Sequence, residues 1–350
     1  MPPRAVILGC AGTRLSAEEA RFFADNDPFG FILFARNVDS PAQLRALTNS
    51  LRQAVGRAEA PVLIDQEGGR VARLRAPRWR EAPAAEIFGR LYRHDPDGAC
   101  EAVRLNALLL AAELQECGID VDCAPVLDLR RPEGHEVIGD RAFSDEVDAV
   151  VALGGAMAEG LMQGGVTPVG KHVPGHGRAP VDSHLELPRV RDSHATLADS
   201  DFRCFQALNG LPWMMTAHVV YEALDKTRPA TTSPAVIAEV IRGEIGFDGV
   251  LVSDDLSMQA LSGDFERRTA DALEAGCDLA LHCNGEMEEM RAVCRAAPSL
   301  SADASRRIET GRARVAAAQK SNGDEAGRTG PETVDQAEIQ QRLDALLQAA

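Results

Sequence analysis

Short apolar runs alternate with amphipathic stretches along most of the 350-residue chain, and this alternation restricts the possible folds more than any other feature. Runs of this length, bounded by Gly, Pro and polar residues, are typical of buried strands, whereas the stretches between them have the apolar spacing of one-sided helices. Eight strand–helix pairs in succession favour an α/β fold, a single (β/α)8 barrel of the TIM type. The predicted strands are residues 5–9, 29–34, 61–64, 121–127, 166–170, 213–216, 250–252 and 279–282. The predicted helices are residues 16–25, 41–56, 98–117, 145–163, 195–208, 233–244, 265–275 and 285–296.

Residues at the predicted helix ends agree with these boundaries. Ser16 and Ser40 stand where N-caps belong, and Pro41 takes the first helical position, which tolerates a missing N–H. Glycines at helix C-caps adopt the left-handed conformation readily. Such glycines are expected at Gly118, Gly246 and Gly276.

An open, doubly wound sheet is the alternative architecture. That fold would be supported by a Gly-x-Gly-x-x-Gly turn after the first strand. The segment Gly9-Cys-Ala-Gly12 lacks this spacing, so no dinucleotide-binding signal is present.

The C-terminal part of the chain changes in character. Residues 1–318 are predicted to form the catalytic barrel, followed by a polar, glycine-containing linker over 319–332. Residues 333–350 have helical periodicity and are predicted to form a final helix, either docked on the barrel or mobile.

Charge and composition exclude several classes of partner. The formal net charge of −16 argues against nucleic acid and against anionic membranes, because both require clustered Lys and Arg. Neither a secretory signal nor an apolar run long enough to span a membrane is found. The eight cysteines include no Cys-x-x-Cys pair and are expected to be free thiols in a reducing compartment. These features predict a cytoplasmic enzyme, and a monomer is favoured.

Ionisable residues follow five consecutive predicted strands. In a TIM barrel, such residues converge at the carboxyl-terminal mouth, where active sites lie. Asp128 and His218 could alternatively be hydrogen-bonded residues of the barrel wall, and Glu67 is expected to be ion-paired beneath its glycine turn. The residues at the strand ends are Asp65, Asp128, Lys171, His172, His218, Asp254 and Asp255.

The most specific stretch is Lys171-His-Val-Pro-Gly-His-Gly177, followed by Asp182-Ser-His184. An Asp two residues before a His can accept the Nδ1 hydrogen bond and leave Nε2 free for proton transfer. For an Asp-x-His triplet alone, the alternative interpretation is a solvent-exposed turn whose histidines have no catalytic role. A zinc site is not expected, because the proline and glycine between His172 and His176 forbid the helix that would put both rings on one face.

One carboxylate question remains open at this point. Asp254 and Asp255 are neighbours on a strand, so only one of them can face the mouth, and parity does not say which. Asp65 and Arg73 form a natural pair for sugar hydroxyls, since the carboxylate accepts and the guanidinium donates. A carboxylate together with a proton carrier is the minimum equipment for displacement at a glycosidic carbon.

Four motifs in order resemble glycoside hydrolase family 3, and within it the bacterial β-N-acetylglucosaminidases of peptidoglycan recycling. The resemblance runs from about residue 5 to residue 318. Val173 departs from the pattern, which usually has a larger apolar residue there. The motifs are Asp65-Gln-Glu-Gly-Gly-Arg-Val-Ala-Arg73, Ile138-Gly-Asp-Arg141, Lys171-His-Val-Pro-Gly-His-Gly177 with Asp182-Ser-His184, and Phe247-Asp-Gly-Val-Leu-Val-Ser-Asp-Asp-Leu-Ser-Met258.

The resemblance implies a role for each candidate residue. Asp254 matches the nucleophile, and His184, held by Asp182, matches the acid/base. The substrate-binding positions matched are Asp65, Arg73, Arg141, Lys171 and His172.

The implied activity is that of a retaining exo-β-N-acetylglucosaminidase without cofactor or metal. Its substrate would be an amino sugar, terminal β-linked N-acetylglucosamine on anhydro-muropeptides, cleaved through a covalent glycosyl-Asp intermediate. The alternatives are a β-N-acetylglucosaminide phosphorylase, or a catalytically silent sugar-binding barrel.

Overall fold

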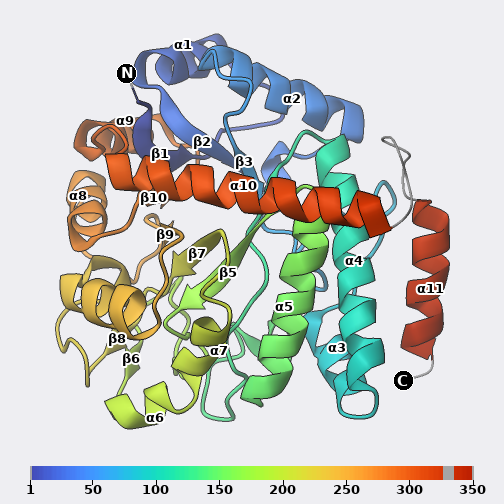
Figure 1. Ribbon diagram of the computed structural model, residues 1–350. Coiled ribbons are helices and arrows are strands. Elements are labelled where there is room, and N and C mark those ends of the chain that lie inside the picture. Colours follow the sequence, from blue (N-terminus) through green and yellow to red (C-terminus); the bar gives the residue numbers. More distant parts are fainter. Residues whose placement is uncertain (1, 326–334, 349–350) are drawn as a thin grey trace.

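The computed structural model describes residues 2–325 and 335–348, and its centre is a closed barrel of eight parallel strands (Figure 1). The order around the barrel is β1-β10-β9-β7-β5-β4-β3-β2. The predicted (β/α)8 barrel and its eight strands are confirmed, although the fourth is shorter than expected. The barrel strands are β1 (Arg4–Leu8), β2 (Pro28–Leu33), β3 (Val62–Ile64), β4 (Val121–Asp122), β5 (Thr167–Val173), β7 (Trp213–Thr216), β9 (Val250–Asp255) and β10 (Leu279–His282).

Apart from α10 (Ala302–Glu325), which the sequence did not predict, the helices around the barrel follow the predicted pattern with three exceptions. Helix α3 was missed, the predicted helix 195–208 is divided into α6 and α7, and the helix predicted at 233–244 is a π-helix. Ser16 and Ser40 each form a capping box. The helices are α1 (Ala17–Asn26), α2 (Pro41–Ala54), α3 (Ala85–Tyr92), α4 (Pro96–Glu116), α5 (Val147–Gln163), α6 (His194–Ala198), α7 (Asp201–Ala207), the π-helix η4 (Val236–Glu244), α8 (Phe265–Ala275) and α9 (Met287–Ala296).

Short elements lie in the loops between the barrel strands. Strands β6 (Arg189–Val190) and β8 (Val220–Tyr221) form a separate two-stranded parallel sheet. The single-turn 3-10 helices are η1 (Ala35–Asn37), η2 (Gly139–Arg141) and η3 (Ala230–Thr232).

The apolar core has two layers, because alternate strand residues face opposite sides of the barrel wall. Ile7, Leu63 and Val169 belong to the cluster inside the barrel. Val6 and Leu8 belong to the cluster between the barrel and its helices. Burial on both faces explains why the strands read as continuous apolar runs.

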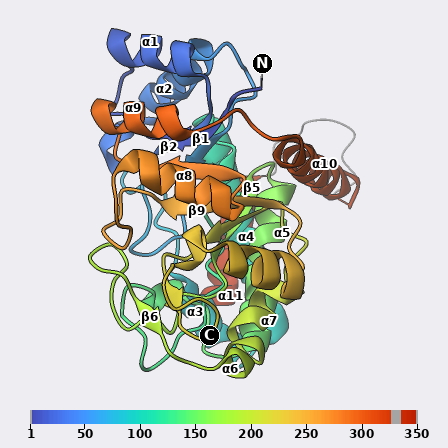
Figure 2. The same ribbon diagram turned by 90° about the vertical axis from the view of Figure 1, so that its left-hand side faces the viewer.

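Helix α10 (Ala302–Glu325) closes the amino-terminal end of the barrel, where Ile308 joins the same inner cluster as Phe29 and Trp213. Figure 1 shows it crossing the barrel, and in Figure 2 it lies to the right of the strands. The predicted start of the linker at residue 319 is therefore wrong, since 319–325 continue this helix. The polar residues 319–321 are exposed on this helix, and residues 326–332 of the predicted linker lie outside the described residues.

Helix α11 (Gln336–Gln348) packs beside α4 on the outside of the barrel (Figure 1). Leu343 is buried in this contact, and Arg342 pairs with Glu101 of α4. No helix within residues 2–325 and 335–348 is both long and apolar enough to cross a membrane.

Candidate active site

A cavity of about 400 Å³ opens at the carboxyl-terminal end of the barrel strands. This volume is within the range of sites for small ligands. All eight residues predicted from the sequence line it, although they come from two strands, β5 and β9, and from the loops after β3, β4 and β5. They are Asp65, Arg73, Arg141, Lys171, His172, Asp182, His184 and Asp254.

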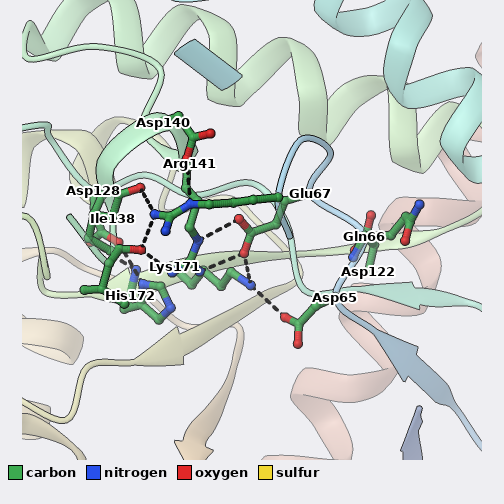
Figure 3. Close-up of polar contacts among 12 residues, drawn as sticks. Asp65, Gln66, Glu67, Asp122, Asp128, Ile138, Asp140, Arg141, Lys171 and His172 are labelled. Carbon is green, nitrogen blue, oxygen red and sulfur yellow. Dashed lines mark hydrogen bonds and ion pairs between the residues drawn. The ribbon is translucent and has the colours of Figure 1, made fainter. Parts of the chain in front are cut away.

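A network of alternating charges forms one wall of the cavity (Figure 3). The buried Lys171 ammonium lies 2.8 Å from Oδ1 of Asp65 and 2.6 Å from Oε1 of Glu67. Nη2 of Arg73 donates to the other Asp65 oxygen at 3.0 Å. Asp65 is thus fixed between two cations, in a position to accept from ligand hydroxyls.

The charges of this network hold one another ionised. Burial alone would raise the pKa of Asp65, but Lys171 and Arg73 outweigh it and leave the pKa below its ordinary value. Burial would likewise lower the pKa of Lys171, and Asp65 and Glu67 raise it instead. The cavity wall therefore stays charged across the neutral pH range.

Arg141, on η2 of the loop after β4, is held by Glu67 through two hydrogen bonds of 2.8 Å. The expectation that Glu67 is ion-paired beneath its glycine turn is confirmed. A two-point contact between guanidinium and carboxylate fixes the plane of the arginine side chain. Glu67 therefore sets the orientation in which Arg141 faces the cavity.

His172 is anchored to Asp128, the buried residue after β4. Its ring Nδ1 lies 2.7 Å from Oδ2 of Asp128, and its backbone N–H donates to Oδ1 at 3.2 Å. Nδ1 is thus engaged, and no hydrogen bond within the described residues occupies the other ring nitrogen, Nε2, which is available to a ligand. Lys171 and His172 both line the cavity, although neighbouring residues of a regular strand face opposite sides. The pairing register between β5 and β7 shifts between Lys171 and Val173.

Asp254 and Asp255, at the end of β9, have different partners. The Asp255 carboxylate accepts from the backbone N–H groups of Ser257 at 2.9 Å and Cys283 at 3.1 Å, and from the Ser257 hydroxyl. The only donor to the Asp254 carboxylate within the described residues is the backbone N–H of Asp255, at 2.8 Å. Asp254 therefore keeps one carboxylate oxygen available to a ligand, whereas Asp255 is occupied in holding the loop.

The pKa of Asp254 is below its ordinary value. Burial acts to raise it, but the nearby His218 and His172 rings and the Asp255 N–H act more strongly in the other direction. His218 itself is a fully buried wall residue, with Nδ1 2.7 Å from the Thr231 hydroxyl oxygen. Asp254 is consequently an ionised carboxylate at neutral pH.

Asp182 and His184 form the pair expected from their spacing, in the loop after β5. Oδ1 of Asp182 lies 2.8 Å from Nδ1 of His184 and also accepts the His184 backbone N–H at 2.9 Å. Burial would raise the pKa of Asp182, but these two bonds lower it. The His184 side chain is 62 % exposed, so Nε2 can face solvent or a leaving group at the rim.

Two residues of this region were not assigned a role from the sequence. His176 and Ser183 are both buried, and His176 lines the cavity together with Ser183. Their motif was visible, but the contact between them depends on how the loop folds back. Within the described part of the chain, no three His, Cys, Asp or Glu side chains are grouped to hold a metal ion.

A barrel with an ionised carboxylate, an Asp–His pair and hydroxyl-binding charges at its mouth is the architecture of a glycosidase. The Glycosyl hydrolase family 3 N-terminal domain matches residues 5–318, and the chain belongs to this family of glycoside hydrolases.

Relatives and solved structures agree with this membership. A beta-hexosaminidase of Alkalilimnicola ehrlichii is 45% identical over 297 residues, which cover 84% of each chain. A beta-hexosaminidase of Methylobacillus flagellatus is 40% identical and covers 80% of each chain. The crystal structure of NagZ from Neisseria gonorrhoeae with N-trifluoroacetyl-D-glucosamine has a TM-score of 0.85 at 32% identity, covering 99% of each chain. The predicted family and enzyme class are thus confirmed: the chain is a glycoside hydrolase of the beta-hexosaminidase type.

Proposed function

We propose that the protein is a retaining exo-β-N-acetylglucosaminidase that works through a covalent bond between the sugar and Asp254. The observation that carries the proposal is the presence, in one cavity, of an ionised carboxylate with a free oxygen and an Asp–His pair whose Nε2 is free. One group can attack the sugar and the other can move a proton, which are the two requirements of a two-step displacement.

In the first step, an Asp254 oxygen forms a bond to the anomeric carbon while the bond from that carbon to the leaving oxygen breaks. His184 gives its Nε2 proton to the departing oxygen, and Asp182 accepts from Nδ1 throughout. In the second step, neutral His184 removes a proton from water, which attacks the anomeric carbon and releases Asp254. A histidine suits this exchange because its unperturbed pKa of about 6.5 is near a neutral operating pH.

The substrate in this proposal is terminal β-linked N-acetylglucosamine. Asp65 and Arg73 supply an acceptor and a donor for sugar hydroxyls, and Lys171, His172 and Arg141 line the same cavity. The names of the relatives and the glucosamine derivative bound to the Neisseria protein support the choice of an amino sugar.

The physiological role that we propose is the removal of this sugar from anhydro-muropeptides in the cytoplasm, as part of peptidoglycan recycling. Its support is the family resemblance of the motifs around Asp65, Lys171 and Asp254, since a hexosaminidase cavity alone suits any terminal β-linked amino sugar.

Trapping of the intermediate tests the mechanism. A 5-fluoro N-acetylglucosaminyl fluoride should inactivate the enzyme, and peptide mass spectrometry should find the sugar on Asp254. A label on another residue, or preference for plain glucosides over N-acetylated ones, would contradict the proposal. Product analysis in phosphate buffer separates hydrolysis from the phosphorolysis alternative, since only the latter yields a sugar phosphate. Turnover should persist in EDTA.

A further inference from the structure

The middle residue of the Asp182-Ser183-His184 triplet is buried, although all three residues line the cavity. Ser183 is only 2% exposed, whereas the His184 side chain is 62% exposed. Oγ of Ser183 lies 3.0 Å from Nε2 of His176, inside the barrel mouth. The same short segment therefore carries both the Asp–His pair and a buried contact beside it.

The backbone of His176 is in turn held by the carboxylate of Asp128. Its backbone N–H donates to Oδ1 of Asp128 at 2.6 Å, and the same carboxylate holds the ring of His172. Burial, and then the charge of His172, lower the pKa of His176 to about 4. The ring is consequently neutral at neutral pH, and its contact with the Ser183 hydroxyl is an ordinary hydrogen bond between uncharged groups.

Few other bonds hold this part of the loop in place. Leu185 and Glu186 donate only to the carbonyl of Asp182, within the loop itself. Gln259 donates to the His184 carbonyl at 3.4 Å, near the upper limit for a hydrogen bond. In residues 2–325 and 335–348, the contact between Ser183 and His176, at the start of the same loop, is the one side-chain hydrogen bond that joins residues 182–187 to another part of the chain.

We propose that His176 is a positioning residue, which through its hydrogen bond to Ser183 holds the Asp182–His184 pair in register with Asp254. The bond ties the exposed proton carrier to the same buried carboxylate, Asp128, that orients His172. A proton carrier displaced by about 1 Å loses much of its effect, so a small contact far from the sugar can govern the rate. The inference rests on the proposed function, because it requires His184 to be the acid/base.

Ser183→Ala is the sharpest test, since it removes one oxygen and no other contact. Two substrates are compared: an N-acetylglucosaminide with a poor alkyl leaving group, and one with an activated dinitrophenyl leaving group. On the alkyl glycoside, kcat should fall at least 10-fold, as part of the roughly 10²–10⁴-fold that general acid help provides. Release of dinitrophenol in the first step, and the inhibition constant of free N-acetylglucosamine, should stay within about twofold of the wild type, because neither depends on the proton carrier.

His176 itself is varied in two ways. In His176→Gln the amide nitrogen can still reach Ser183, and in His176→Leu it cannot. Glutamine should restore a large part of the alkyl glycoside rate that leucine loses. Equal losses in the two variants would contradict the positioning role, provided that the fraction of active enzyme, titrated with the fluorinated inactivator, is the same in both.

The double variant separates this inference from the proposed function. With His184→Ala already present, Ser183→Ala should cause no further loss on the alkyl glycoside, since nothing remains to be positioned. If Ser183→Ala caused its full loss again in the double variant, the positioning role of His176 would be wrong, while the acid/base assignment would stand. The same holds if the Ser183→Ala enzyme were as fast as the wild type on that substrate. If His184→Ala itself shows no dependence on the leaving group, the acid/base assignment fails, and the inference fails with it.

Discussion

The backbone N–H of Asp255 donates a 2.8 Å hydrogen bond to Oδ1 of Asp254, so the main chain of the second aspartate orients the carboxylate of the first. The Asp255 carboxylate is itself held by Ser257 and by the Cys283 N–H from the end of β10. Asp255 thus fixes the loop after β9, and its main chain presents Asp254 to the cavity with one oxygen free.

This arrangement predicts opposite outcomes for the two isosteric variants. Asp254→Asn should abolish turnover, because an amide neither attacks the anomeric carbon nor leaves as a carboxylate. Asp255→Asn should retain measurable turnover but lose about 1–3 kcal/mol of stability, since one of its acceptor oxygens becomes an NH2 group. Activity and urea unfolding measured on both proteins distinguish the outcomes. A dead Asp255→Asn enzyme beside an active Asp254→Asn enzyme would reverse the assignment.

The sequence predicted the barrel because burial on both faces makes each strand a continuous apolar run with an abrupt polar end. The positions where chemistry concentrates were therefore visible as the first polar residues after Ile64 and within 169–172. Helix α10 was missed because its mean composition is polar, and only Ile308 and a few neighbours reveal the face that closes the barrel.

Contacts between distant segments could not be predicted in the same way. Nothing in the sequence pairs Glu67 with Arg141, 74 residues away, or Ser183 with His176 within one loop, because both contacts depend on how the loops fold. The alternation of side chains along the strand could not decide between Asp254 and Asp255, and the choice of Asp254 came from the family resemblance. In the structure both line the cavity, and they differ in which partners occupy their oxygens.

Asp65 offers a test of sugar binding that preserves the fold. Asp65→Asn keeps one acceptor oxygen, and Lys171 keeps its contact with Glu67. A hydrogen bond to a charged group is worth about 1.5–3 kcal/mol, so kcat/KM for the N-acetylglucosaminide should fall roughly 10- to 100-fold. Asp39→Asn, which alters an exposed pair with Arg78, is the matched control and should leave kcat/KM unchanged. An equal effect from the two variants would remove Asp65 from the binding site.

Glu67 predicts a component of acid unfolding. Burial acts to raise its pKa, but Arg141 and Lys171 lower it from 4.5 to about 2. A lowered pKa in the folded state contributes stability that is fully present above 4.5 and is lost as the pH falls towards 2.

Glu67→Gln should therefore be less stable than the wild type at pH 7, by about 3 kcal/mol or more, because the buried Arg141 loses its partner. The difference should shrink as the pH falls, since protonation removes the same charge from the wild type. Urea unfolding measured from pH 7 down to the acid transition gives both curves. Glu116→Gln, at an exposed position of α4, is the control and should follow the wild type. A constant gap between Glu67→Gln and the wild type at all pH values would contradict the assignment.

The two-step role of His184 gives the most specific kinetic prediction. Protonation matters most for a poor leaving group, so His184→Ala should slow cleavage of a natural disaccharide by roughly 10²–10⁴-fold. With an aryl glycoside of low leaving-group pKa, the first step needs little acid, but water still lacks its base in the second. The variant should then release a burst of phenol and accumulate the glycosyl-enzyme on Asp254.

Asp182→Ala should show a milder form of the same defect, because the imidazole remains but loses its 2.8 Å partner. Rapid-mixing kinetics with mass spectrometry of the quenched enzyme make the comparison. Equal slowing of good and poor leaving groups, without a burst, would leave His184 as a binding residue and move the search for the acid/base to other groups of the mouth.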